Sequence, residues 1–285
     1  MDTQSWRDKA NYFDFQGHRI AYWVGGQMRA PALLLVHGFP TCSWDWAPVW
    51  DTLLAKYRLI ACDMLGFGLS DKPRSGYSIH RQTDLQEALL AHLGVTAFDA
   101  LVHDYGVSVG QELLARDIVA VKPVTVSKVV FLNGGIFPDQ HRPRPMQKLG
   151  ISPFGFLLGL LMSRNSFGKS FCEVFGPNTQ PSKAELDAFW EFISHNRGNR
   201  IAHKLLHYIA DRVKHKQRWE SALIGSQYKI GLINGALDPV SGQHAYDKWR
   251  EVVPDARHHL LPEIGHYPQV EAPDEVAGKV LEWLA

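Results

Sequence analysis

Cysteine is scarce in this sequence, and its scarcity narrows the classes of protein that the chain can encode. The 285 residues include three cysteines, Cys42, Cys62 and Cys172, whose spacing matches neither a zinc site nor a redox pair. We therefore expect reduced thiols in a cytoplasmic protein. The first nine residues carry both charge signs and no apolar run, so no signal peptide is expected.

An excess of charge of one sign and a long apolar run are also lacking. The formal net charge is +1, which gives no electrostatic reason to expect nucleic acid or an anionic membrane as a partner. Residues 154–162 resemble a membrane segment, but Gly155 and Gly159 interrupt it, and a span needs about 20 apolar residues. We expect no transmembrane segment and a buried or pocket-lining helix there, with peripheral lipid contact left open.

Short apolar runs alternate with helix-forming segments in the first half of the chain. The runs with the length of buried strands are 32–36, 59–62, 98–102 and 129–132. A hairpin is expected over residues 13–24, and a helix is expected between Ser78, which can cap its start, and Gly94 at its end. This alternation predicts an α/β fold with a mostly parallel sheet covered by helices on both faces.

The pattern changes in the middle of the chain, where helix signals and turns occur without a convincing strand. A capping box formed by Ser182 and Glu185 opens one of these helices. Strands and helices then alternate again up to a closing helix. We therefore predict a core of residues 1–136 and 227–285, with a helical cap inserted at 137–226.

Three side chains with catalytic chemistry fall where predicted strands end, namely Asp104, Asp238 and His266. The carboxyl ends of parallel strands share one edge of a sheet, so these side chains can converge. Nucleophile, acid and histidine follow one another in the chain order of the α/β-hydrolase triad. The sequence therefore predicts Asp104 as the nucleophile, exposed at a corner between a strand and a helix, with Asp238 and His266 as its partners.

Several motifs resemble one branch of the α/β-hydrolases, which contains the epoxide hydrolases and haloalkane dehalogenases. These motifs are HGFP at 37–40, DMLGFGLS at 63–70, HDYG at 103–106 and GH at 265–266. Longer strings resemble the mesoderm-specific transcript proteins of that branch: LGFGLSDKPR at 65–74, NGGIFP at 133–138, HRP at 141–143, FGP at 175–177 and LDPV at 237–240. The likeness covers nearly the whole chain from about Gly38 and implies an α/β-hydrolase fold with a helical cap.

The resemblance implies hydrolysis in two steps without a cofactor. Asp104 would attack an sp³ carbon to form an alkyl ester, and His266, oriented by Asp238, would activate the water that cleaves the ester. Backbone N–H groups of Phe39 and Tyr105 would form the oxyanion hole. An aspartate suits an epoxide or a carbon–halogen bond better than an ordinary ester, because attack on an ester would give a mixed anhydride.

The leaving group separates epoxide from halide chemistry. Dehalogenases of this branch commonly place a tryptophan after the nucleophile and often an asparagine after His-Gly, whereas this chain has Tyr105 and Phe39 there. Epoxide hydrolases use two cap tyrosines as acids, and Tyr208 resembles the second. The cap has no other tyrosine. Its absence argues against efficient epoxide opening, unless another group supplies the second proton donor. Epoxide hydrolysis is the leading expectation, with Tyr208 as an acid.

Other interpretations stay open. Asp104 could simply start a helix. The string GVSVG at 106–110 is a literal G-x-S-x-G, so Ser108 could be the nucleophile of an esterase or lipase, although the strand would then bury the charge of Asp104. Haloalkane dehalogenation is a further enzyme alternative. A ligand-binding protein that keeps a hydrolase scaffold is the alternative outside enzymes.

The remaining predictions concern what surrounds the triad. Phe39, Trp44, Tyr105 and Tyr208 are expected to bind the substrate, although Trp44 after such a loop can equally be core. His37 and His103 are expected to orient loops through hydrogen bonds. A small apolar substrate and water are the expected partners, with no metal and no nucleic acid. The sequence leaves the oligomeric state open.

Overall fold

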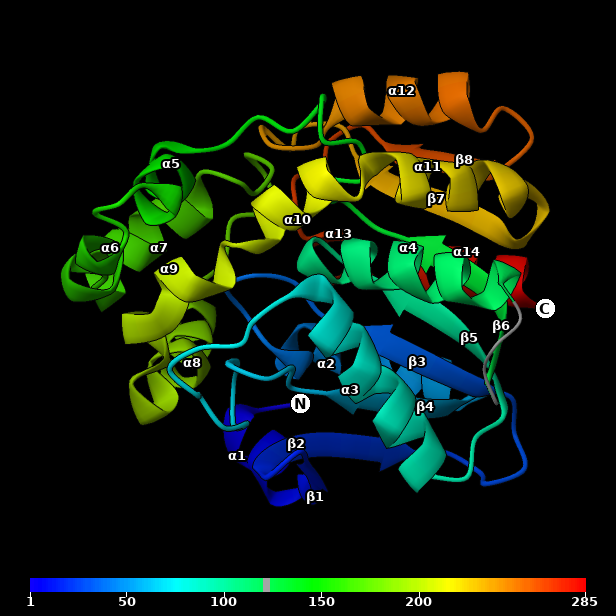
Figure 1. The fold of residues 1–285 in the computed structure, drawn as a ribbon, viewed down its shortest axis with the longest axis horizontal. Helices are drawn as coiled ribbons and strands as arrows, with labels where there is room; N and C mark the ends of the chain where they lie inside the picture. Colours follow the sequence, from blue (N-terminus) through cyan, green and yellow to red (C-terminus); the bar gives the residue numbers. More distant parts are fainter. Residues whose placement is uncertain (120–123) are drawn as a thin grey trace.

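The computed structural model describes residues 1–119 and 124–285, and one eight-stranded sheet organises them (Figure 1). The strands are β1 (Asn11–Phe15), β2 (His18–Gly25), β3 (Ala32–Val36), β4 (Arg58–Cys62), β5 (Ala97–Val102), β6 (Thr125–Phe131), β7 (Ile230–Gly235) and β8 (Arg257–Leu261). Their order in the sheet is β1-β2-β4-β3-β5-β6-β7-β8. Strand β2 is antiparallel to both neighbours, and the other pairs are parallel. The predicted mostly parallel sheet is confirmed.

Apolar runs form the central strands because both faces of the sheet are covered. In β3, Leu34 and Val36 join one hydrophobic cluster, whereas Leu33 and Leu35 join the other. Adjacent side chains of a strand point to opposite faces, so a strand covered on both sides is apolar at every position. The predicted run 129–132 is the end of β6, whose earlier residues alternate between buried and exposed.

Helices cover both faces of the sheet. The hydrophobic cluster that contains Leu34 also includes side chains of α3 (Ile79–His92), α4 (Tyr105–Ile118), α11 (Lys216–Gly225) and α12 (Gln243–Val252). The hydrophobic cluster that contains Leu33 includes side chains of α1 (Thr3–Asp8), α2 (Ala47–Leu54) and α14 (Pro273–Leu284). Helix α3 begins as predicted, because the Ser78 side chain accepts a hydrogen bond from the Arg81 N–H at 3.1 Å.

Helices and turns fill the stretch between β6 and β7, and those formed by residues 145–205 gather beyond the carboxyl ends of the strands, at the left of Figure 1. They are α5 (Pro145–Ile151), α6 (Phe156–Leu161), α7 (Arg164–Cys172), α8 (Lys183–Ser194), η2 (His195–Ile201), α9 (Ala202–Leu205), α10 (Tyr208–Lys214), α11 and η3 (Gln227–Lys229). The predicted capping box opens α8, with Glu185 N–H donating to Ser182 at 3.2 Å. Helix α11 packs along α4. The boundaries of the cap stay a prediction.

The segment 154–162, which resembles a membrane segment in sequence, forms α6 and its flanks. Leu158 and Met162 are buried, whereas Phe156, Leu160 and Leu161 are exposed. The expected buried helix is therefore buried on one side only. Among the residues that the structure describes, no helix is long and apolar enough to cross a membrane.

Candidate active site

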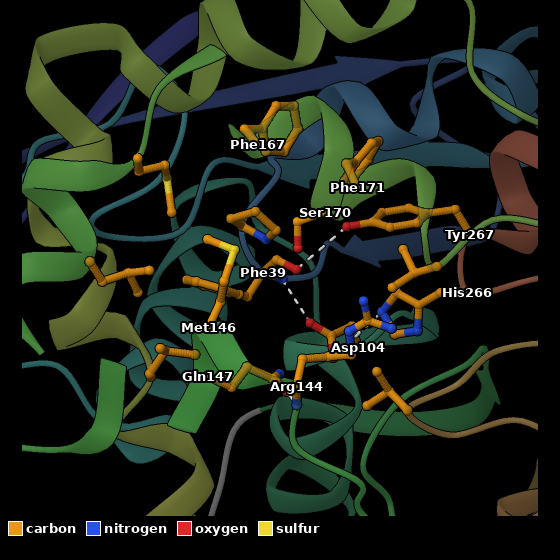
Figure 2. A pocket seen from close by; sticks show the side chains of 16 residues that line it. Phe39, Asp104, Arg144, Met146, Gln147, Phe167, Ser170, Phe171, His266 and Tyr267 are labelled. Atoms are coloured by element: carbon orange, nitrogen blue, oxygen red, sulfur yellow. Dashed lines mark hydrogen bonds and ion pairs between the residues drawn. The ribbon is translucent and has the colours of Figure 1, made fainter. Parts of the chain in front are cut away.

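Asp104 occupies the corner between β5 and α4 in a strained backbone conformation. Its φ of 46° and ψ of −104° lie where a side chain other than glycine is rarely found. The corner is held by Asn133, whose carbonyl accepts the Asp104 N–H at 2.8 Å. The sharp turn directs the carboxylate into a cavity above the end of the sheet, as Figure 2 shows. Such strain is concentrated at functional sites.

The predicted partners of Asp104 lie beside it. His266 places its Nε2 at 3.8 Å from Oδ1 of Asp104, and its Nδ1 donates to Oδ2 of Asp238 at 2.7 Å. The structure therefore brings together three side chains that are far apart in the sequence. The imidazole bridges the two carboxylates, which is the geometry of a general base with an orienting acid.

Asp238 is buried and fully supplied with hydrogen-bond donors. Its carboxylate accepts from the Ser241 hydroxyl at 2.6 Å, from the Val240 N–H at 2.8 Å and from the Asn133 amide at 3.1 Å. Burial alone would raise the pKa of Asp238, but His266 and these donors hold that pKa well below its usual range. Asp238 therefore stays ionised and orients the imidazole of His266.

The two neighbouring carboxylates favour the protonated form of His266. Burial alone would lower the pKa of His266, but the charges of Asp238 and Asp104 outweigh burial and raise it to about 9. Loss of the negative charge of Asp104 would remove one of these two charges and lower the pKa of His266.

The loop that holds Phe39 comes within hydrogen-bond distance of the carboxylate. The Phe39 N–H donates to Oδ2 of Asp104 at 2.9 Å. Tyr105 is the first residue of α4, where a backbone N–H has no acceptor within the helix. Both predicted oxyanion donors are thus adjacent to the carboxylate, and their role stays a prediction.

Two further histidines fix the surrounding loops, as the sequence predicts. Nε2 of His37 accepts the Met64 N–H at 3.0 Å, and its Nδ1 lies 2.9 Å from the Gly38 carbonyl. Nε2 of His103 donates to the His266 carbonyl at 2.8 Å. Burial and the nearby His266 lower the pKa of His103 to about 3, so His103 stays neutral.

Ser108 lies beyond the corner, and a buried arginine donates a hydrogen bond to its hydroxyl. It is the fourth residue of α4, and its Oγ accepts from Nε of Arg212 at 2.7 Å. Another nitrogen of Arg212, Nη2, donates to the Asp104 carbonyl at 2.8 Å. The geometry places the carboxylate of Asp104, not the hydroxyl of Ser108, next to the imidazole. It therefore does not support the serine-esterase alternative.

Tyr208 is buried at the start of α10, close to the corner. Its ring centre lies 4.8 Å from that of Tyr105, and the guanidinium of Arg212 lies 4.4 Å from it. The Gln147 amide approaches its hydroxyl at 3.5 Å. Burial, followed by the charge of Asp104, raises the pKa of Tyr208, so its hydroxyl keeps its proton and can act as a donor.

The cavity beside Asp104 is lined mainly by apolar side chains. Its lining residues are Phe39, Pro40, Asp104, Arg144, Met146, Gln147, Leu158, Met162, Phe167, Ser170, Phe171, Val174, Leu206, Val240, His266 and Tyr267. In Figure 2, Phe167 and Phe171 lie across the cavity from Asp104. The cavity therefore suits a small apolar molecule with one reactive centre.

Only one of the four predicted substrate-binding residues, Phe39, lines this cavity. Trp44 lies outside it and packs on α8, with its ring centre 5.0 Å from that of Phe189. Tyr105 and Tyr208 are not among its lining residues. Gln147, which does line the cavity, donates to the Tyr208 hydroxyl at 3.5 Å.

Sequence reasoning missed several polar residues of the site. Arg144, Gln147, Ser170 and Tyr267 line the cavity, and no motif marks the first three. Tyr267 directly follows His266, so its position pointed to the site, and its hydroxyl donates to the Phe39 carbonyl at 3.4 Å. Among the described residues, no cluster of three or more His, Cys, Asp or Glu side chains could hold a metal ion.

A family model agrees with this architecture. The model described as "alpha/beta hydrolase fold" matches residues 31–273. A mesoderm-specific transcript homolog protein from Bos taurus is 41% identical over 281 residues, which cover 94% of this chain and 84% of the relative. The resemblance predicted from the motifs is therefore confirmed.

Solved structures agree on the fold. A haloalkane dehalogenase DbeA-M1 loop variant from Bradyrhizobium elkanii superposes with a TM-score of 0.80, 21% identity and coverage of 96% of both chains. The epoxide hydrolase CorEH superposes with a TM-score of 0.77 and 18% identity, over 96% of this chain and 98% of that one. The predicted fold class is thereby confirmed.

Proposed function

The chain belongs to the alpha/beta hydrolase fold family, which supports a hydrolase, and from this premise we propose that it hydrolyses a small apolar epoxide through an ester on Asp104. The observation that carries the proposal is a carboxylate at the strained corner, with an imidazole nitrogen 3.8 Å from it. A carboxylate forms a hydrolysable ester when it attacks an sp³ carbon. No cofactor is required.

In the first step, an oxygen of Asp104 attacks an epoxide carbon and the carbon–oxygen bond of the ring breaks. The departing alkoxide takes a proton from a hydroxyl donor. In the second step, water adds to the carbonyl of the ester while His266 accepts its proton. The oxyanion is stabilised by N–H groups of Phe39 and Tyr105. Collapse expels the alcohol, to which His266 returns the proton, and leaves Asp104 as a carboxylic acid. That acid gives its proton back to the hydroxyl donor of the first step, which restores both the carboxylate and the donor.

The donors around the cavity favour an oxygen leaving group over a halide. Tyr105 and Phe39 occupy the positions where an indole or an amide would donate to a halide. The polar groups at the cavity include the Tyr267 hydroxyl and the Gln147 amide, which contacts Tyr208 at 3.5 Å. We assign the proton of the alkoxide to Tyr208, with Gln147 replacing the missing second tyrosine.

Turnover of an epoxide, a haloalkane and an ester that share one alkyl chain tests the proposal. We expect the epoxide to react fastest, and Tyr208→Phe to slow its turnover by about 10²-fold, as for loss of a general acid. The same variant should leave any haloalkane reaction nearly unchanged, because a halide needs no proton. Asp104→Asn should abolish both reactions.

Three other results would overturn the proposal. Faster haloalkane turnover identifies a dehalogenase, and ester hydrolysis that survives in Asp104→Asn identifies a different nucleophile. Inertness toward all three substrates, with tight binding of one of them, identifies a ligand-binding protein on a hydrolase scaffold.

The three free thiols support a cytoplasmic location for the reaction.

A further inference from the structure

Helix α6 is apolar on all sides, although only one side of it is covered. Leu158 and Met162 line the active-site cavity. Phe156, Leu160 and Leu161, on the outer side, are 51%, 55% and 67% exposed. A helix that is apolar all round is normally buried in protein or in lipid, so its outer side requires an explanation.

Further exposed apolar residues lie close to α6 in the sequence. Ile151 and Phe154, just before α6, are 51% and 63% exposed. Together with the three outer residues of α6 they form what we call the cap-tip face. Large exposed apolar patches on a folded protein mark interaction surfaces, not ordinary surface.

The two segments that carry and contact the cap-tip face are rich in Lys and Arg, although the chain as a whole is almost neutral at +1. Residues 140–172 contain five Lys or Arg and no Asp or Glu, and residues 195–210 contain three Lys or Arg and again no acid. The two segments share one side of the molecule, because α6 packs against η2. At the contact, a Cβ on Gly159 would lie 2.6 Å from the Arg200 carbonyl oxygen.

Several of these cations are free to meet an external partner. Lys148, Arg197 and Arg200 are exposed, as is the neighbouring Arg74. Within the described part of the chain, none of the four makes an ion pair. Arg74, Arg197 and Arg200 line one groove with Phe156 and Leu160. Cationic and apolar side chains are thus mixed on one surface.

We propose that the cap-tip face docks on the surface of an anionic lipid bilayer. Its aromatic and leucine side chains would enter the boundary between headgroups and acyl chains, as in interfacial amphipathic helices. The surrounding Lys and Arg side chains would be attracted to anionic headgroups. This inference goes beyond the proposed reaction and does not depend on it.

Charge also argues against a second copy of the chain as the occupant. A symmetric dimer through this face would bring two clusters of unpaired cations together, and like charges at an interface oppose association.

Docking on lipid has a further consequence. Because the inner side of α6 lines the cavity, an apolar substrate dissolved in the bilayer would be held next to the site that consumes it.

Co-sedimentation of the full-length protein with lipid vesicles tests the proposal. We expect binding to phosphatidylcholine vesicles that contain phosphatidylglycerol, weak binding to pure phosphatidylcholine, and release in about 1 M salt, where the Debye length falls to about 3 Å. The double variants Arg197→Glu/Arg200→Glu and Leu160→Ser/Leu161→Ser should each lower partitioning by roughly tenfold or more. These residues are exposed, so both variants should fold.

Matched changes at other exposed sites serve as controls. Arg29→Glu/Lys56→Glu makes the same charge change at exposed residues outside the two basic segments, and Ile224→Ser/Tyr228→Ser removes apolar side chains that are also exposed. Both controls should bind vesicles like the unmodified protein. Absence of binding to anionic vesicles, or an equal loss in the controls, would overturn the proposal. So would a dimer in sedimentation equilibrium that Leu160→Ser/Leu161→Ser dissociates.

Discussion

Arg212 donates a hydrogen bond from Nη2 to the backbone carbonyl of Asp104, over a distance of 2.8 Å. The same buried guanidinium binds the Ser108 hydroxyl at 2.7 Å and lies over the ring of Tyr208. It therefore links the strained corner, the first turns of α4 and the proposed acid on α10. Because the corner aims the proposed nucleophile, we infer that Arg212 is a positioning residue.

Arg212→Ala should lower kcat by about 10²-fold, since a small displacement of a reacting group has an effect of this size. Arg212→Lys keeps the charge but loses the planar guanidinium group. Its kcat should therefore lie between that of Arg212→Ala and that of the unmodified enzyme. Steady-state kinetics on the preferred epoxide measures both, and circular dichroism confirms folding. Ser108→Ala, which removes only the acceptor, should stay within roughly threefold of the unmodified enzyme. A kcat in Arg212→Ala close to that of the unmodified enzyme would contradict the role.

His266→Gln should stop the reaction at the ester. Asp104 can still attack the epoxide, but no base remains to activate water. Intact-mass spectrometry of the variant after mixing with substrate should show an added mass equal to one substrate molecule, located by peptide mapping on the segment containing Asp104. The double variant His266→Gln/Asp104→Asn is the control and should gain no mass. Adduct formation on any other residue would refute the mechanism.

Asp238→Asn should move the pH dependence of kcat. His266 must be neutral to act as a base, so kcat rises as pH rises through the pKa of His266 in the ester intermediate. The charge of Asp238 raises that pKa, so its removal should shift the acid limb to lower pH. The maximum rate should fall by roughly 10²- to 10⁴-fold, because the imidazole loses its orienting partner. An acid limb that stays in place would show that another group controls it.

Glu112 should contribute to stability in a pH-dependent manner. Its side chain is buried on α4 and accepts hydrogen bonds from Arg116, Arg218 and Trp219. Burial alone would raise the pKa of Glu112, but these donors lower it from 4.5 to about 2. The stabilisation is therefore complete above the unfolded pKa and is lost as pH falls from about 4.5 toward 2.

Urea denaturation of Glu112→Gln measures this contribution. At neutral pH the variant should lose about 3 kcal/mol of unfolding free energy, and the difference from the unmodified protein should narrow as pH approaches 2. Glu282→Gln, which alters an exposed ion pair with Lys279, should change stability little. A difference that stays constant with pH would assign the effect of Glu112→Gln to packing instead of charge.

The sequence predicted the sheet, and it predicted that Asp104, Asp238 and His266 would lie close together, because local signals coincide with the fold there. Run 32–36 is apolar at every position because β3 is covered on both faces. Asp104, Asp238 and His266 each follow a strand, so the topology of a parallel sheet alone predicts that they meet. These inferences need no knowledge of side-chain packing.

Features that depend on how helices cross could not be predicted. Arg212 lies in the string DRVK, which is typical of an exposed helix, and it is buried only because α10 meets α4 at the corner. Trp44 was expected in the pocket, but the short helix η1 (Ser43–Trp46) turns its ring toward α8. The packing of the polar helix α11 along α4 likewise has no signal in the sequence.

A single turnover in heavy-oxygen water, with enzyme in excess of epoxide, tests whether Asp104 forms the ester. If Asp104 forms the ester, water attacks its carbonyl carbon, so the label enters the Asp104 carboxylate. The new hydroxyl of the product then carries the unlabelled oxygen that Asp104 donated. Label found in the product and absent from Asp104 would mean that water attacked the substrate directly or that another nucleophile was used, and it would contradict the account.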